Sequence, residues 1–101
     1  LVQALNGGII ADDLSARMDP ATRDSALQAE YKALEYTPAG ETVAWGKSGQ
    51  QFTGEVVASQ PYRVGSQNCR RYSHTVYAAG APVANRGTAC RNADGSWTPL
   101  A

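Results

Sequence analysis

The chain has 101 residues, and its nine Lys and Arg residues balance nine Asp and Glu residues. This length suits one small domain, because it leaves no room for a second hydrophobic core. The balanced charge gives no overall attraction to nucleic acid or anionic lipid. No uncharged apolar run approaches the ~18 residues of a membrane-spanning helix. The composition therefore predicts a small globular domain that neither binds nucleic acid nor spans a membrane.

Residues 1–18 are predicted to be irregular or to form a short helix. A glycine-containing turn at 6–8 precedes a short apolar step at 9–10, and a brief helix is expected over Ala11–Met18. Because the chain begins at Leu1 rather than Met, we expect it to be a piece of a longer precursor. A single α+β domain is expected over residues 19–101.

An amphipathic helix is predicted from Pro20 to about Tyr36. Asp19 is a favoured N-cap residue, and Pro20 suits the first helical position because its missing N–H costs nothing there. The apolar residues recur at helical spacing. They are Leu27, Tyr31 and Leu34, with Ala26, Ala29 and Ala33 alongside. A Thr-Pro-Ala-Gly run at 37–40 ends the helix.

The pattern becomes alternating after residue 41. Strands are predicted at 42–45, 52–60, 69–77, 83–91 and 96–99. The turns between them are too short for crossover connections, which indicates an antiparallel meander. The expected fold is therefore α+β, with one N-terminal amphipathic helix, or two, packed on a four- to five-stranded sheet.

The only two cysteines are Cys69 and Cys90. A single disulfide in an oxidising compartment is favoured over two unrelated buried thiols. If the two cysteines pair, the register places Arg71 opposite Thr88 and Ser73 opposite Arg86 on one polar face, with a loop at 78–81. The other face would point toward the helix and carry Tyr72, His74, Val76, Val83 and Ala89.

Several fragments between about Ala26 and Trp97 resemble one known family. They are Ala33–Gly40 with Val43–Trp45, Cys69-Arg70 with Tyr72 and Thr75-Val76, Gly87–Arg91, and Asp94–Trp97. In this combination the chain resembles the 17 kDa outer-membrane surface antigen family of proteobacteria. The resemblance implies an exported envelope protein of the outer membrane or periplasm, commonly a lipoprotein. Residues 6–10 resemble the tail of that family's glycine-rich segment, and any lipid anchor would lie upstream of this chain.

Catalytic motifs are scarce. His74 is the only histidine, so a metal site lacks further ligands. A nucleophile pair of His74 with Cys69 or Cys90 would require reduced cysteines, and a partly buried strand histidine is favoured. The neighbouring carboxylates are expected on a solvated helix face rather than flanking a cleft. They are Asp12, Asp13, Glu30 and Glu35. We therefore predict no catalytic residue, metal or cofactor.

Six aromatic residues could form a stacking platform for a glycan or a single strand, although core packing is favoured for both tryptophans. They are Tyr36, Trp45, Tyr62, Tyr72, Tyr77 and Trp97. Tyr62 lies in a predicted loop and is the aromatic expected to be exposed.

Charge is distributed unevenly along the chain. Residues 1–55 carry eight acids and four bases, a net −4, whereas residues 56–101 carry five arginines and one acid, a net +4. Pairing of these arginines with the helix acids is favoured over an exposed cationic face, because opposite charges on facing layers attract. The candidate partner-binding residues are Tyr62, Arg63, Arg70, Arg71, Arg86 and Arg91.

The sequence leads to two candidate functions. The first is a non-enzymatic envelope surface antigen domain with a structural or interaction role, stabilised by the Cys69–Cys90 disulfide. The alternative is a binding or inhibitor module that engages an anionic protein or envelope polymer through the arginine-rich sheet face.

Overall fold

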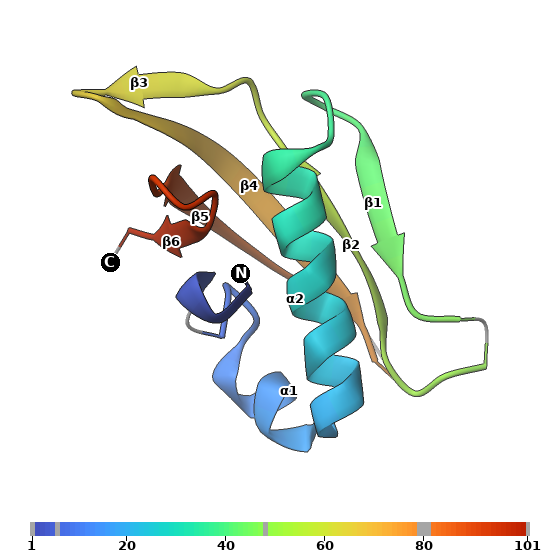
Figure 1. The fold of residues 1–101 in the computed structure, drawn as a ribbon. Helices are drawn as coiled ribbons and strands as arrows, with labels where there is room; N and C mark the ends of the chain where they lie inside the picture. The colour runs from blue at the N-terminus through green and yellow to red at the C-terminus, as the bar shows by residue number, and fades with distance from the viewer. Residues whose placement is uncertain (1, 6, 48, 79–81, 101) are drawn as a thin grey trace.

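The computed structural model describes residues 2–5, 7–47, 49–78 and 82–100. The helical elements are η1 (Val2–Leu5), α1 (Asp12–Arg17) and α2 (Pro20–Glu35). The strands are β1 (Thr42–Trp45), β2 (Thr53–Ala58), β3 (Tyr62–Val64), β4 (Gln67–Tyr77), β5 (Val83–Arg91) and β6 (Trp97–Pro99). All pairings are antiparallel, in the order β1-β2-β4-β5-β6. Figure 1 shows α2 lying across one face of this sheet. The predicted α+β fold is confirmed.

The sheet has six strands rather than four or five, because β3 is additional. The predicted strand at 52–60 ends at Ala58, and Pro61 cannot donate an N–H to a ladder. Pairing then resumes from Tyr62↔Cys69 to Val64↔Gln67, across a turn in which Gly65 has φ +62°. This short hairpin starts β4 two residues before the predicted boundary.

The helix α2 begins where the sequence predicts. The Asp19 side chain accepts a hydrogen bond from the Thr22 backbone N–H at 2.8 Å, and Pro20 occupies the first turn. The predicted apolar face of α2 packs on the core, with Leu27 and Tyr31 half-buried at its edge and Glu30 as an unpredicted buried member. The buried residues are Ala26, Ala29, Glu30, Ala33 and Leu34. This small-residue face allows the helix backbone to lie close to the sheet.

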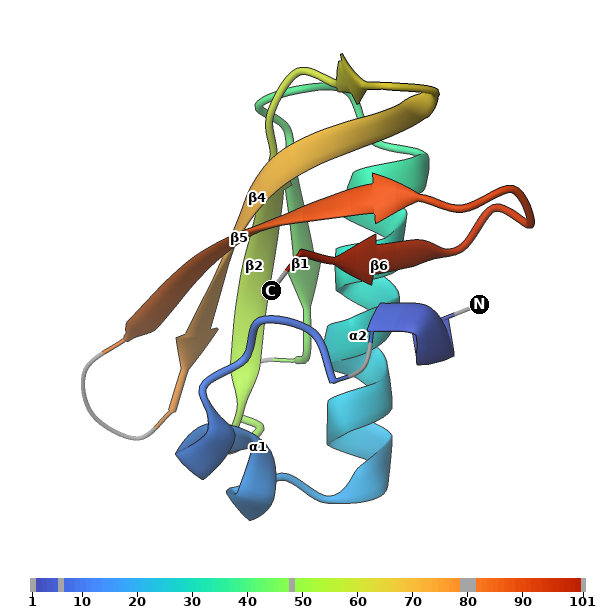
Figure 2. The ribbon, with the colours of Figure 1, turned by 90° about the vertical axis from the view of Figure 1, so that its left-hand side faces the viewer.

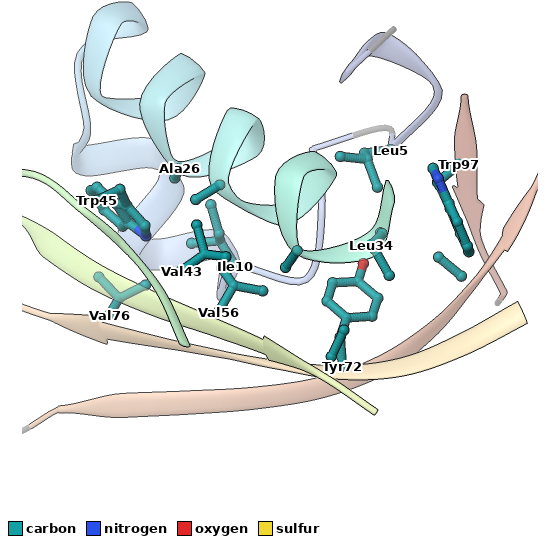
Figure 3. Close-up of a cluster of buried hydrophobic side chains, with 14 of the residues drawn as sticks. Leu5, Ile10, Ala26, Leu34, Val43, Trp45, Val56, Tyr72, Val76 and Trp97 are labelled. Atoms are coloured by element: carbon teal, nitrogen blue, oxygen red, sulfur yellow. The ribbon is translucent and has the colours of Figure 1, made fainter. Parts of the chain in front are cut away.

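The core lies between the sheet, α2 and the N-terminal segment, as Figure 3 shows for a cluster of its buried side chains. The N-terminal eighteen residues contribute Leu5, Ile10, Leu14 and Met18 to it. Figure 2 shows η1 beside β6 and α1 near the start of α2, so η1 covers the β6 side of the sheet. None of the described helices is long and apolar enough to span a membrane.

The predicted β4–β5 register is confirmed. Cys69 lies opposite Cys90, Arg71 opposite Thr88 and Ser73 opposite Arg86. The inward positions predicted on β4 are buried, as is Ala89 on β5. Val83 is instead 38% exposed, because it is the first residue of β5, at the loop end of the β4–β5 hairpin and away from the helices. Residues 79–81 of the predicted loop, and residue 6 of the predicted N-terminal turn, lie outside the described residues.

Candidate functional sites on the two faces of the sheet

A buried acid–histidine pair joins α2 to β4. The Glu30 Oε2 atom lies 2.6 Å from His74 Nδ1, and the two side chains are 0% exposed. The Ile9 backbone N–H donates to the same oxygen at 3.2 Å. One carboxylate therefore connects the N-terminal segment, the helix and the sheet.

Trp45 determines the tautomer of His74. The Trp45 Nε1 atom lies 2.7 Å from His74 Nε2, and an indole N–H can only donate a hydrogen bond. His74 Nε2 is therefore unprotonated, and Nδ1 carries the hydrogen donated to Glu30. In an acid–histidine pair that acts as a general base, Nε2 must accept a proton from the nucleophile. Here the indole occupies that nitrogen, so the arrangement fits a structural role.

Two glycines leave space for this cluster. A Cβ atom on Gly8, which has φ +68°, would lie 2.5 Å from Glu30 Oε1 and 2.6 Å from Oε2. A Cβ atom on Gly54 would lie 2.5 Å from Trp45 Nε1 and 2.7 Å from the Thr75 carbonyl oxygen. Any larger residue at either position would displace a member of the cluster.

Tyr72 of β4 points from the sheet toward α2, beside Leu34 (Figure 3). Burial and then the negative charge of Glu30 raise the pKa of the Tyr72 hydroxyl, which therefore stays protonated at neutral pH. Among the described residues, the Tyr72 hydroxyl and Glu30 Oε1 are the buried side-chain polar atoms that lack a hydrogen-bond partner.

The prediction that Glu30 lies on a solvated helix face is wrong. A detectable signal was its spacing, because Ala26, Glu30, Ala33 and Leu34 follow i, i+4, i+7 and i+8 and share one helical face. The prediction followed the residue type, because glutamate is almost never buried unless it is paired. Glu30 is such a paired glutamate, so the helical spacing was the better guide. Asp12 and Asp13 are exposed in α1, as predicted.

Arg70 caps the end of α2. Its guanidinium Nη1 lies 2.9 Å from each of the carbonyl oxygens of Ala33, Leu34 and Thr37, and its Nε donates to Ser59 O at 2.8 Å. The last carbonyls of a helix lack intrahelical donors and carry partial negative charge, so a cation is favoured there. Burial lowers the pKa of Arg70 from its usual value.

The favoured pairing of arginines with helix acids is observed for Arg91. Its Nε lies 2.8 Å from Glu35 Oε1, which also accepts from Trp97 Nε1 at 3.1 Å. The hydrogen bond that Arg91 donates to the Glu35 carboxylate raises the pKa of Arg91. Within the part of the chain that the structure describes, no other arginine–carboxylate pair is formed. Arg63 is exposed on β3, on the helix side of that strand.

The six candidate partner-binding residues therefore divide between the two faces. Arg71 and Arg86 point to the face that no described helix covers, and both are exposed. The Arg71 guanidinium lies 5.8 Å from the centre of the Tyr62 ring, which joins the same face. A groove of about 480 Å³ runs between the two arginines, over Val57, Ala58 and the strands β4 and β5.

The aromatic residues do not form one platform. Trp45, Trp97 and Tyr72 are buried, which confirms core packing for both tryptophans. Tyr62 is exposed, as predicted, whereas Tyr36 at the end of α2 and Tyr77 at the far end of β4 lie elsewhere.

The cysteines form the Cys69–Cys90 disulfide, so the predicted pairing is confirmed. Both are oxidised and belong to outward-pointing positions, whereas His74 points toward α2, so a cysteine–histidine nucleophile pair is contradicted. Across the described ranges, no group of three or more His, Cys, Asp or Glu side chains is arranged to hold a metal ion.

These features define a disulfide-bonded α+β domain whose acid–histidine pair is enclosed in the core. The chain belongs to the 17 kDa outer membrane surface antigen family, whose model matches residues 32–98. It is 37% identical over 87 residues to the 17 kDa surface antigen of Rickettsia bellii, covering 85% of this chain and 55% of that protein. The corresponding protein of Rickettsia felis is 37% identical over 81 residues, covering 79% of this chain and 51% of the relative.

The chain thus spans about half the length of the curated relatives it matches. No solved structure matches it.

Proposed function

We propose that this chain is a non-enzymatic domain of a cell-envelope surface antigen, exported to the outer membrane or periplasm, with a structural or interaction role. Family membership and the Rickettsia surface antigens support an envelope location. The disulfide supports an oxidising compartment, because such bonds are rare where cytosolic reductants act.

The observation that carries the non-enzymatic role is the contact between Trp45 and His74. The Glu30–His74 pair is the arrangement in the described chain that most resembles catalytic machinery. The ring nitrogen that a general base would use, His74 Nε2, accepts a hydrogen bond from the Trp45 indole N–H at 2.7 Å. Both side chains of the pair are inaccessible to a substrate. The pair itself joins α2 to β4, and its hydrogen bonds to Ile9 and Trp45 add the N-terminal segment and β1, which gives the pair a structural task instead.

Fractionation of cells that express the full-length protein tests this proposal. We expect the protein in the envelope fraction, with both cysteines unreactive toward an alkylating reagent until a reductant is added. Recovery in the cytoplasmic fraction with two reactive thiols would overturn the proposed location. A cytoplasmic protein of known abundance and a periplasmic one serve as fractionation controls.

A second candidate is a binding module that uses the outer sheet face against an anionic protein or envelope polymer. It is supported by the two exposed arginines, Arg71 and Arg86, which have no carboxylate partner among the described residues. Retention on a polyglutamate resin tests it. Weaker retention of Arg71→Ala/Arg86→Ala than of Arg63→Ala is expected, and equal retention of the two proteins would contradict it.

A further inference from the structure

Arg71 and Arg86 stand close enough together to share one ligand. They lie on adjacent strands, and the pairs Arg71↔Thr88 and Ser73↔Arg86 make them diagonal neighbours on the same face. The Cα atoms of such neighbours are about 7–8 Å apart, which long side chains can bridge. Guanidinium groups bind phosphate and carboxylate through paired N–H donors. The two side chains can therefore hold a single anionic group between them.

The charged groups around the two arginines leave this site positive. On the helix side, Glu30 and Glu35 bind His74 and Arg91 and point away from the groove. On the outer face, Glu55 of β2 lies on the neighbouring row of the sheet, where its carboxylate accepts a hydrogen bond from Tyr77. β3 contributes the uncharged Tyr62 ring beside Arg71.

The groove between the arginines has an apolar floor. The Val57 side chain of β2 points into it, Ala58, Gly40 and Gly87 border it with backbone atoms because Ala58 shares the helix side with Tyr72, and Ser73 and Thr88 supply hydroxyl groups. Its volume of about 480 Å³ lies within the ~300–1,000 Å³ that is typical of small-molecule sites. A ligand that fills it would bury apolar surface as well as place a charge.

The direction of the groove limits the kind of ligand. It lies across the face of β2, β4 and β5 rather than along a strand edge, so a peptide strand lying in it would not continue a backbone ladder of the sheet. Affinity for a polyanion grows with the number of its charges that the protein neutralises, so two arginines gain little from an extended polyanion. The apolar floor requires an apolar remainder.

We propose that this groove binds a single-headed anionic amphiphile, with its phosphate or carboxylate between Arg71 and Arg86 and its apolar chain over Val57. The proposal rests on the interaction role proposed for the domain, uses the same outer face as the second candidate function, and replaces the ligand of that candidate. It names a ligand class for that face, a soluble amphiphile rather than a protein or an extended polymer.

Titration of the ¹⁵N-labelled chain with octyl phosphate, below its micelle concentration, tests the proposal. We expect saturable shifts in the amide signals of residues 71–73 and 86–88. Arg71→Ala and Arg86→Ala should each weaken binding about tenfold or more, since each removes charge-assisted hydrogen bonds. Arg63→Ala, which removes an exposed arginine from the other side of the sheet, should leave binding unchanged. Circular dichroism shows whether each variant is folded.

Three comparison ligands separate the alternatives. Inorganic phosphate and octanol, which supply the head or the chain alone, should each bind at least tenfold more weakly than octyl phosphate. Equal binding of phosphate would reduce the site to an anion site, and equal binding of octanol would remove the role of the arginines. Tighter binding of polyglutamate would assign the face to an acidic polymer. Any of these three outcomes, or the absence of saturable shifts, would overturn the amphiphile proposal. None of them would change the envelope location expected in the fractionation experiment.

Discussion

Replacing Glu30 with leucine should strongly destabilise the domain. The carboxylate accepts from His74 Nδ1 at 2.6 Å and from the Ile9 N–H at 3.2 Å, both with Oε2. Leucine would fill the space but leave both donors without an acceptor. Each buried unsatisfied group costs about 1–3 kcal/mol, so with two such groups the free energy of unfolding should fall by about 2–6 kcal/mol. That is a large share of the ~5–15 kcal/mol typical of a small domain.

Urea unfolding followed by circular dichroism at 222 nm measures this loss. Glu30→Gln keeps an acceptor for both donors, and should cost less than half as much as Glu30→Leu. Asp24→Leu makes the same kind of change at an exposed position of the same helix, and should change stability by no more than about 0.5 kcal/mol. A loss below about 1 kcal/mol in Glu30→Leu, or equal losses in the glutamine and leucine variants, would refute the assigned role of the buried carboxylate.

Three further predictions concern a glycine beside this cluster, the disulfide and the N-cap of α2. Gly8→Ala should lower the free energy of unfolding by about 1–3 kcal/mol more than Gly7→Ala, measured by thermal or urea unfolding. Both positions have positive φ, but only at Gly8 would the added Cβ atom collide with Glu30. Equal losses in the two variants would mean that the carboxylate moves out of the way freely. Replacing both Cys69 and Cys90 with alanine should lower the free energy of unfolding by ~3 kcal/mol, because the disulfide closes a loop with a sequence separation of 21. An unchanged urea midpoint would contradict this prediction. Asp19→Ala should lower the melting temperature at pH 7. Hydrogen bonds from Thr22 lower the pKa of Asp19 from its usual 3.8, so its stabilising effect is complete above that value and disappears as the pH falls through the lowered pKa. The difference between parent and variant should therefore shrink below about pH 4, and a difference that stays constant to pH 2 would show that the carboxylate charge is not involved.

Alternation and the two cysteines made most of the sheet predictable. A period of two defines which residues share a face, and a single cross-strand pair then fixes the register of β4 and β5. The Asp19-Pro20 start of α2 was predictable because its capping depends only on neighbouring residues.

Features that depend on contacts between distant segments could not be predicted in the same way. The cap that Arg70 provides for α2 exists because β4 passes under the end of the helix, and no local pattern reports this. β3 has only three residues and follows a proline, so it gives no periodic signal. Glu30 lies in a buried position because His74, 44 residues away, supplies a donor.

The formal net charge of zero does not reveal that the arginines lie on different faces of the sheet. Arg70 and Arg91 are used within the fold by helix carbonyls and by Glu35, which accounts for part of the attraction expected between layers. Arg71 and Arg86 remain on the uncovered face. Which arginines face the helix follows from strand alternation once the register is known.

The tautomer of His74 at neutral pH is the most direct test of the claim that its pairing with Glu30 is structural. A long-range ¹H–¹⁵N correlation spectrum distinguishes the two ring nitrogens of a histidine. We predict a hydrogen on Nδ1, an unprotonated Nε2, and a Trp45 indole N–H that exchanges slowly with solvent, as the 2.7 Å contact requires. A hydrogen on Nε2, or a Trp45 indole N–H that exchanges as rapidly as an exposed one, would show that the ring nitrogen is open, and would contradict the structural role.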